Sequence, residues 1–181
     1  MIRFIKCAAR SCKRLLRRED GNASVEFIVI VPLYLTLLTM SVELSMITLR
    51  QTMLERGLDI AVRDIRLGTG TNPTHDAIKR RICEEVYVID DCFNSIKLEM
   101  VPSDMRNLTT LGGEAMCTDK EETGTPVLSF TPGQQNQLMF LRACAKFDPL
   151  FPTWQLARSL KKDNSGQVAI VSMSAFVQEP L

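Results

Sequence analysis

The feature that most constrains this chain is an apolar run from Phe27 to Leu49, in which Glu43 is the only charged residue. A helix of this length rises about 35 Å, which is enough to cross a hydrocarbon core of about 30 Å. We therefore expect residues 27–49 to span a membrane.

Charge is distributed unevenly around this run. Residues 1–20 carry seven Lys and Arg against Glu19 and Asp20, a net +5, whereas the remainder has 15 Lys and Arg against 19 Asp and Glu, a net −4. Cationic flanks stay in the cytoplasm, so the amino terminus is expected there and the residues after about 50 outside. A nucleic-acid-binding arm fits less well, because the apolar run follows the basic residues directly.

Other kinds of apolar segment fit this run to different degrees. A removable secretory signal has a core of about 7–15 residues and a small-residue cleavage site, and no such site follows Leu49. A lipoprotein signal is disfavoured because Cys7 and Cys12 precede the run. A plain signal anchor remains open.

Helical periodicity continues beyond the run. Leu54, Leu58, Ala61 and Ile65 recur at helical spacing, and glycines at 68 and 70 end the pattern. One helix is predicted from 22 to 67, carrying an apolar stripe that needs a partner surface.

The remaining residues predict a small α+β domain over 68–181. A second short helix begins at the cap Thr74 and presents Ala77, Ile78, Ile82 and Val86 on its apolar side. Segments 95–101, 137–147 and 167–177 have strand character, with a loop and short helix at 149–162. We expect an antiparallel sheet of three or four strands packed against the long helix, with an irregular insertion at about 104–136.

Four cysteines follow the apolar run, namely Cys83, Cys92, Cys117 and Cys144. In an exported domain they predict two disulfides, for which three connectivities exist. We favour Cys83–Cys92, which are close in sequence, and hence Cys117–Cys144. A zinc site fits poorly because the first two lack metal-ligand spacing and His75 is the only imidazole.

No catalytic constellation stands out. With a single histidine, no Ser, His and Asp set can be assembled convincingly, and no serine lies in a nucleophile elbow. We expect no enzyme, no cofactor, no metal, no small-molecule substrate and no nucleic-acid partner.

The junction of leader and apolar run reads RREDGNASVEFIVIVPL, with Gly21 five residues before Glu26. It resembles type IV pilin precursors, which are cut after a glycine and keep a glutamate as the fifth mature residue; Asn22 would then be the new first residue. Chance would give this pair at this place in about half a per cent of chains. Burial of Glu26 among apolar helices requires a partner, which a neighbouring subunit's freed amino group would supply. Alternatively, Glu26 is an interfacial charge that begins an ordinary anchor.

More specifically, the chain resembles the TadE-like pseudopilins of the tight-adherence (Tad, or Flp) pilus system. The likeness rests on GNASVEFIVIVPLYLTLLTMSVEL, RQTMLERGLDIAVRDIRLGT, the loop around Cys83 and Cys92, FTPGQQNQLMFLRACAKFDPLFP and the final FVQEPL. The polar insertion and the pair Cys117 and Cys144 depart from it. The resemblance implies a minor pilin-like assembly subunit, processed by a prepilin peptidase, in a bacterial inner membrane with a periplasmic domain. Its implied partners are other pilin-like subunits and the pilus assembly platform.

Two further hypotheses stay open. Glu43 is a candidate intramembrane contact, because an ionisable group in a spanning helix is a functional candidate; alternatively it reaches outward or pairs with Arg50. The protein as a whole is either a pilin-like subunit or a permanently anchored periplasmic adapter that never enters a filament. Cleavage at Gly21 separates these two.

Overall fold

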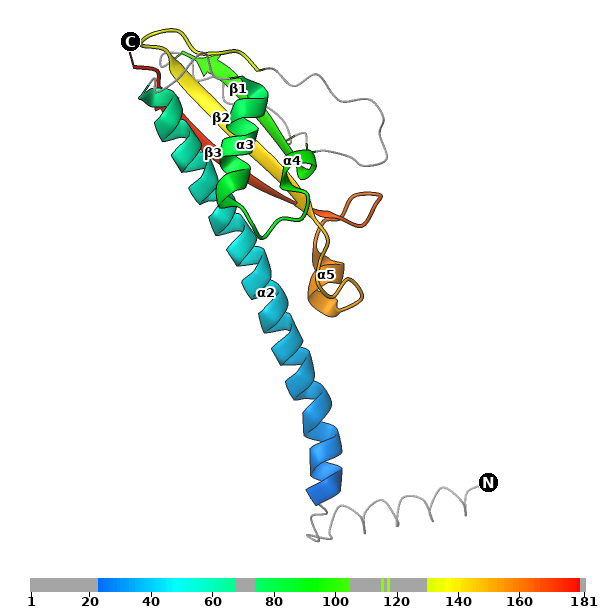
Figure 1. Ribbon diagram of the computed structural model, residues 1–181. Coiled ribbons are helices and arrows are strands. Elements are labelled where there is room, and N and C mark those ends of the chain that lie inside the picture. Colours follow the sequence, from blue (N-terminus) through cyan, green and yellow to red (C-terminus); the bar gives the residue numbers. More distant parts are fainter. Residues whose placement is uncertain (1–22, 68–73, 105–114, 116, 118–129, 180–181) are drawn as a thin grey trace, which may run out of the picture. The chain divides into compact units, whose positions relative to one another are not determined.

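The computed structural model describes residues 23–67, 74–104, 115, 117 and 130–179 (Figure 1). The chain divides into two compact units, residues 1–39 and 40–181. The predicted leader at 1–21 and most of the predicted insertion at 104–136 lie outside the described residues.

Helix α2 (Ala23–Arg66) begins and ends one residue inside the predicted limits of 22 and 67. Pro32 lies inside the helix, where it cannot donate a hydrogen bond. The Thr36 hydroxyl donates to the Pro32 carbonyl at 2.6 Å, a local bond that leaves the helix unbroken. The long helix expected from the periodicity is therefore confirmed.

The carboxyl-terminal part of α2 belongs to the second unit and supplies part of its core. Leu54, Leu58, Ala61 and Ile65, the stripe predicted from helical spacing, are all buried. Gly57 lies on the same side: a Cβ at this position would come within 3.0 Å of the Ile82 carbonyl oxygen. The absence of a side chain at Gly57 therefore allows α2 to approach the next helix closely.

That next helix, α3 (His75–Glu85), begins at the predicted cap. The Thr74 side chain accepts a hydrogen bond from the Ala77 N–H. Ile78, Ile82 and Val86 are buried as expected, but Ala77 is exposed, so its prediction as a core residue was wrong. Ala77 precedes Ile78 by one residue, and the turn of about 100° per residue places it off the buried stripe.

The sheet contains β1 (Ile96–Ser103), β2 (Leu138–Phe147) and β3 (Val168–Val177), antiparallel in the order β1-β2-β3. Its register pairs Leu98 with Ala143 and Ala145 with Ile170, and all four are in the core. Helices α2 and α3 lie on the same face of this sheet (Figure 1). The α+β architecture is therefore confirmed, with three strands.

Two short helices complete the second unit. Helix α4 (Cys92–Ser95), which the sequence did not reveal, follows α3 and is joined to it by the Cys83–Cys92 disulfide. Helix α5 (Gln155–Ser159) lies in the connection from β2 to β3 and falls within the short helix expected at 149–162.

Polar side chains are paired on the other face of the sheet. Arg142 on β2 donates to the facing Glu99 on β1 at 2.9 Å, and Lys146 donates to Asp163 at 2.7 Å. A second disulfide joins Cys117 to Cys144 between them on β2. The two disulfides are the pairs that the sequence analysis favoured.

Candidate functional site

The predicted processing site lies at the start of α2. Gly21 and Asn22 fall outside the described residues, whereas Glu26 lies in the first helical turn and is exposed. A carboxylate at this position interacts favourably with the positive end of the helix dipole. The Glu26 side chain is therefore accessible to a partner, and its role stays a prediction.

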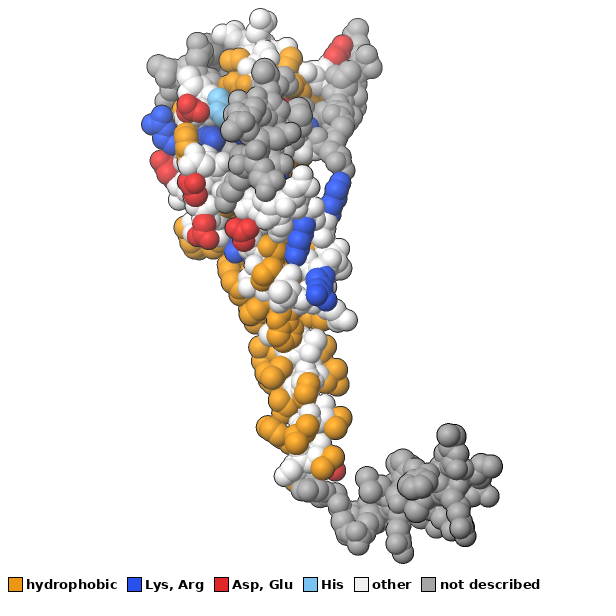
Figure 2. Space-filling view, turned by 90° about the vertical axis from the view of Figure 1, so that its right-hand side faces the viewer, with side chains coloured by type: hydrophobic (Ala, Val, Ile, Leu, Met, Phe, Trp, Pro, Cys, Tyr) orange, Lys and Arg blue, Asp and Glu red, His pale blue; other side chains and the backbone are white. Residues whose placement is uncertain are grey.

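The first unit presents an apolar surface. Figure 2 shows hydrophobic side chains around the amino-terminal half of α2, and by length and composition this helix could cross a membrane. None of its most apolar 18-residue window is buried within the protein. The exposed large side chains in this half are Val25, Phe27, Ile28, Val29, Ile30, Leu33, Tyr34, Leu35, Leu37 and Leu38. Such a surface needs lipid or other apolar helices around it.

Glu43 marks the point at which α2 becomes engaged with the second unit. Its side chain is only 2% exposed, and its carboxylate accepts hydrogen bonds from the Leu150 N–H at 3.1 Å and the Phe151 N–H at 2.8 Å. The suggestion that this side chain reaches outward was therefore wrong. Glu43 is instead an acceptor that holds the loop after β2 against the helix.

The local sequence explains why this loop offers two adjacent donors. Leu150 and Phe151 stand between Pro149 and Pro152, which have no N–H groups. Neither donor takes part in a sheet ladder, and hydrogen bonds from N–H groups to an ionised carboxylate are stronger than those to a neutral acceptor. The sequence signal for this site is thus an ionisable residue in an apolar run together with a Pro-Leu-Phe-Pro loop, but nothing in the sequence links the two.

Arg50 lies two turns after Glu43 on α2 and is also buried, at 7% exposure. Its Nε donates to the Val88 carbonyl at 3.3 Å, and its guanidinium lies 4.5 Å from the centre of the Phe147 ring. Within the described part of the chain its Nη1 has no hydrogen-bond partner. Both charges that flank the predicted outer end of the span are therefore directed at the folded unit, and the limit at Leu49 stays a prediction.

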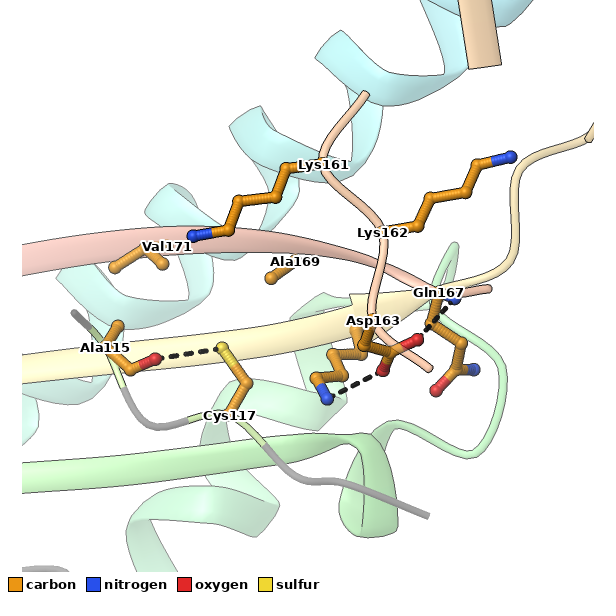
Figure 3. Close-up of a pocket in the computed structure, with 9 residues that line it drawn as sticks. Ala115, Cys117, Lys161, Lys162, Asp163, Gln167, Ala169 and Val171 are labelled. Atoms are coloured by element: carbon orange, nitrogen blue, oxygen red, sulfur yellow. Dashed lines mark hydrogen bonds and ion pairs between the residues drawn. The ribbon is translucent and has the colours of Figure 1, made fainter. Parts of the chain in front are cut away.

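A groove of about 400 Å³ lies on the sheet face that carries Cys117 (Figure 3). Lys146 in this groove pairs with Asp163, and the Lys162 ammonium group donates to the Pro152 carbonyl at 3.1 Å. Burial alone would raise the pKa of Asp163, but hydrogen bonds from Lys146, the Gln167 N–H and Ser165 lower that pKa below its ordinary value. These contacts are structural ion pairs and offer no nucleophile with an adjacent base.

The same reading applies to metals. Among the residues that the structure describes, no group of three His, Cys, Asp or Glu side chains could hold a metal ion. The four cysteines after the apolar run are joined in disulfides. The features that stand out are therefore the apolar helix surface with Glu26 and the buried charges at Glu43 and Arg50.

Residues 21–63 match the family model described as TadE-like protein. The match supports a TadE-like protein of Tad pilus systems. The TadE-like segment starts at Gly21 and includes Glu26, Glu43 and Arg50, so all three charged helix residues discussed above fall within it. No curated protein and no solved structure matched the chain.

Proposed function

We propose that this TadE-like protein is a minor pilin-like subunit that helps to assemble a Tad-type adhesive pilus. A prepilin peptidase removes the leader after Gly21, and α2 then packs against the helices of other pilin-like subunits at the assembly platform. Before assembly the chain resides in the bacterial inner membrane, with its amino terminus in the cytoplasm and its disulfide-bonded domain in the periplasm.

One observation carries this proposal. The TadE-like match covers the half of α2 that presents unburied apolar side chains to its surroundings. A surface of this kind is equally suited to lipid and to neighbouring apolar helices, since both provide dispersion contacts without water. It therefore supports a helix that exchanges a lipid environment for a bundle of subunits.

Glu26 is proposed to set the position of one subunit against the next. In the structure it is an exposed carboxylate near the start of α2. Moved among apolar helices, it would be strongly destabilising unless it were paired. The amino group created at Asn22 by cleavage supplies a partner of opposite charge on a neighbouring subunit.

The processing step is tested by the mass of the membrane-extracted protein, with and without the matched prepilin peptidase. We expect a mature chain that starts at Asn22, and we expect Gly21→Ala to remain uncut. Gly70→Ala, at a glycine far from the junction, should be cut normally. A chain that keeps Met1 in the presence of the active peptidase would contradict processing and favour the anchored adapter.

The role of Glu26 has a separate test. Glu26→Ala should still be exported but should reduce the number of pili per cell, counted by electron microscopy. Glu55→Ala, which removes an exposed glutamate further along α2, is the matched control and should leave piliation unchanged. Normal piliation in Glu26→Ala cells would show that the carboxylate does not set subunit position.

A further inference from the structure

The connection between β2 and β3 carries an exposed apolar tip. Leu150 is 49% exposed and Trp154 is 38% exposed, and the Trp154 ring centre lies 6.2 Å from that of Phe151. Large apolar and aromatic side chains at the surface mark contact sites more often than structural ones. This tip therefore needs an explanation beyond the fold.

The tip is held in a fixed position within the second unit. Ala157 of α5 is fully buried, and Leu160 packs against the hydrophobic core. The Lys162 ammonium group bonds to the Pro152 carbonyl, and Glu43 holds the backbone of Leu150. The exposed side chains of Leu150 and Trp154 are thus presented by an anchored segment.

The bonds to Glu43 also set the level of this tip along α2. A helix that starts to span between Ala23 and Phe27 and rises about 30 Å ends between about residues 42 and 46. Glu43 lies within that interval, and its carboxylate is within hydrogen-bond distance of the Leu150 and Phe151 amides. The tip is therefore at the depth where hydrocarbon gives way to headgroups.

The charge of the same segment is opposite to that of its surroundings. Residues 148–162 contain Arg158, Lys161 and Lys162 against Asp148 alone, a net +2, whereas the chain after residue 20 has a net −4. Arg158 and Lys161 are exposed, and Asp148 accepts a hydrogen bond from the Gln167 side chain. Aromatic and cationic side chains together are characteristic of the membrane–water interface.

We propose that the segment Asp148–Lys162 is an interfacial membrane contact for anionic lipid headgroups. Leu150 and Trp154 enter the headgroup layer of the membrane that α2 spans, and Arg158 and Lys161 bind the lipid phosphates. The inference rests on the membrane span of α2 and does not require removal of the leader.

Trp154 is the only tryptophan in the chain, so its fluorescence reports on this segment alone. The full uncleaved chain is reconstituted into phosphatidylcholine vesicles with and without phosphatidylglycerol. We expect lipids brominated near the headgroup to quench Trp154 strongly, and iodide quenching to fall several-fold when phosphatidylglycerol is present. Full iodide access to Trp154 in both kinds of vesicle would overturn the proposal.

Charge reversal tests the role of the basic residues. The double variant Arg158→Glu, Lys161→Glu should regain iodide access in phosphatidylglycerol vesicles, whereas Arg80→Glu, an exposed arginine on α3, should behave as the unmodified chain. Equal quenching of the double variant and the unmodified chain would refute headgroup binding by these two residues. Iodide access in vesicles that disappears only in assembled pili would assign the tip to a neighbouring subunit instead. All measurements use the uncleaved chain, so a failure of leader processing would leave them unaffected.

Discussion

The Glu43 carboxylate accepts a 2.8 Å hydrogen bond from the Phe151 N–H, although the two residues are 108 positions apart in the sequence. A second bond from the Leu150 N–H reaches the other carboxylate oxygen. Two backbone donors in a loop with few other partners thus depend on one side chain of the long helix.

Removal of this acceptor should destabilise the loop. Glu43→Ala leaves two N–H groups without their acceptor, and we expect the free energy of unfolding in detergent to fall by about 1–3 kcal/mol. Glu43→Gln keeps a carbonyl oxygen and should cost less. Thermal unfolding followed by circular dichroism, and hydrogen exchange of a peptide covering 148–154, measure the two effects. Glu55→Ala is the exposed control, and unchanged exchange in Glu43→Ala would show that the loop does not depend on Glu43.

The close approach at Gly57 predicts that a single methyl group is harmful. The added Cβ would lie 3.0 Å from both the Ile82 carbonyl oxygen and a Val86 methyl carbon. Overpacking of this kind costs about 1–3 kcal/mol, which exceeds the gain of about 1 kcal/mol in helix propensity. We therefore expect Gly57→Ala to lower the unfolding temperature. Gly57→Ala combined with Val86→Gly should be less sensitive to the added methyl group, whereas Thr52→Ala on the exposed side should be nearly neutral; a stabilised Gly57→Ala variant would contradict the close packing.

The two disulfides should contribute unequally to stability. They close loops with sequence separations of 9 for Cys83–Cys92 and 27 for Cys117–Cys144. Loop-closure entropy then predicts losses of about 2.5 and 3.5 kcal/mol, respectively, when each pair is replaced by alanine. Denaturant unfolding of the two double variants measures the difference, with alanine at the leader residues Cys7 and Cys12 as a control. Four freely reactive thiols in the exported domain of the unmodified protein would contradict both bridges.

Asp163 should contribute an acid limb to the stability profile. Its pKa is lowered in the folded protein: burial opposes this shift, but hydrogen bonds from Lys146, the Gln167 N–H and Ser165 outweigh it. A lowered pKa stabilises the fold above the ordinary value of 3.8, and that contribution is lost as the pH falls through the folded pKa. Asp163→Asn should therefore differ most from the unmodified protein above about pH 4, and the difference should shrink at lower pH. Urea titrations from pH 2 to 7 test this, with exposed Asp59→Asn as a control; a constant difference over that range would exclude Asp163 as the titrating group.

Local patterns were sufficient to predict most of the architecture. The helical spacing of Leu54, Leu58 and Ile65 identified the buried side of α2, because in a helix spacing alone determines which side chains share a face. Alternation in the segment starting near Ile96 likewise identified β1. These features depend on neighbours in the sequence, and the sequence shows neighbours directly.

The details that sequence analysis missed depend on contacts between distant segments. Gly57 has no distinguishing neighbour in the sequence, and its purpose is visible only beside Ile82 on α3. The burial of Glu43 similarly requires the loop at Leu150, which lies beyond the entire sheet-forming strand β2. A charge in an apolar run could be recognised as unusual, but the group that satisfies it could not be named.

The packing of α2 has a mechanical consequence. Leu54, Leu58 and Ile65 belong to the same continuous helix as the apolar amino-terminal half, so a pulling force along the helix acts on the domain's own core. The core resists such a load in shear, whereas the two hydrogen bonds at Glu43 are the first tertiary polar contacts along the force path. A subunit drawn out of a membrane by this helix would therefore yield first at the loop after β2, while its sheet remained folded.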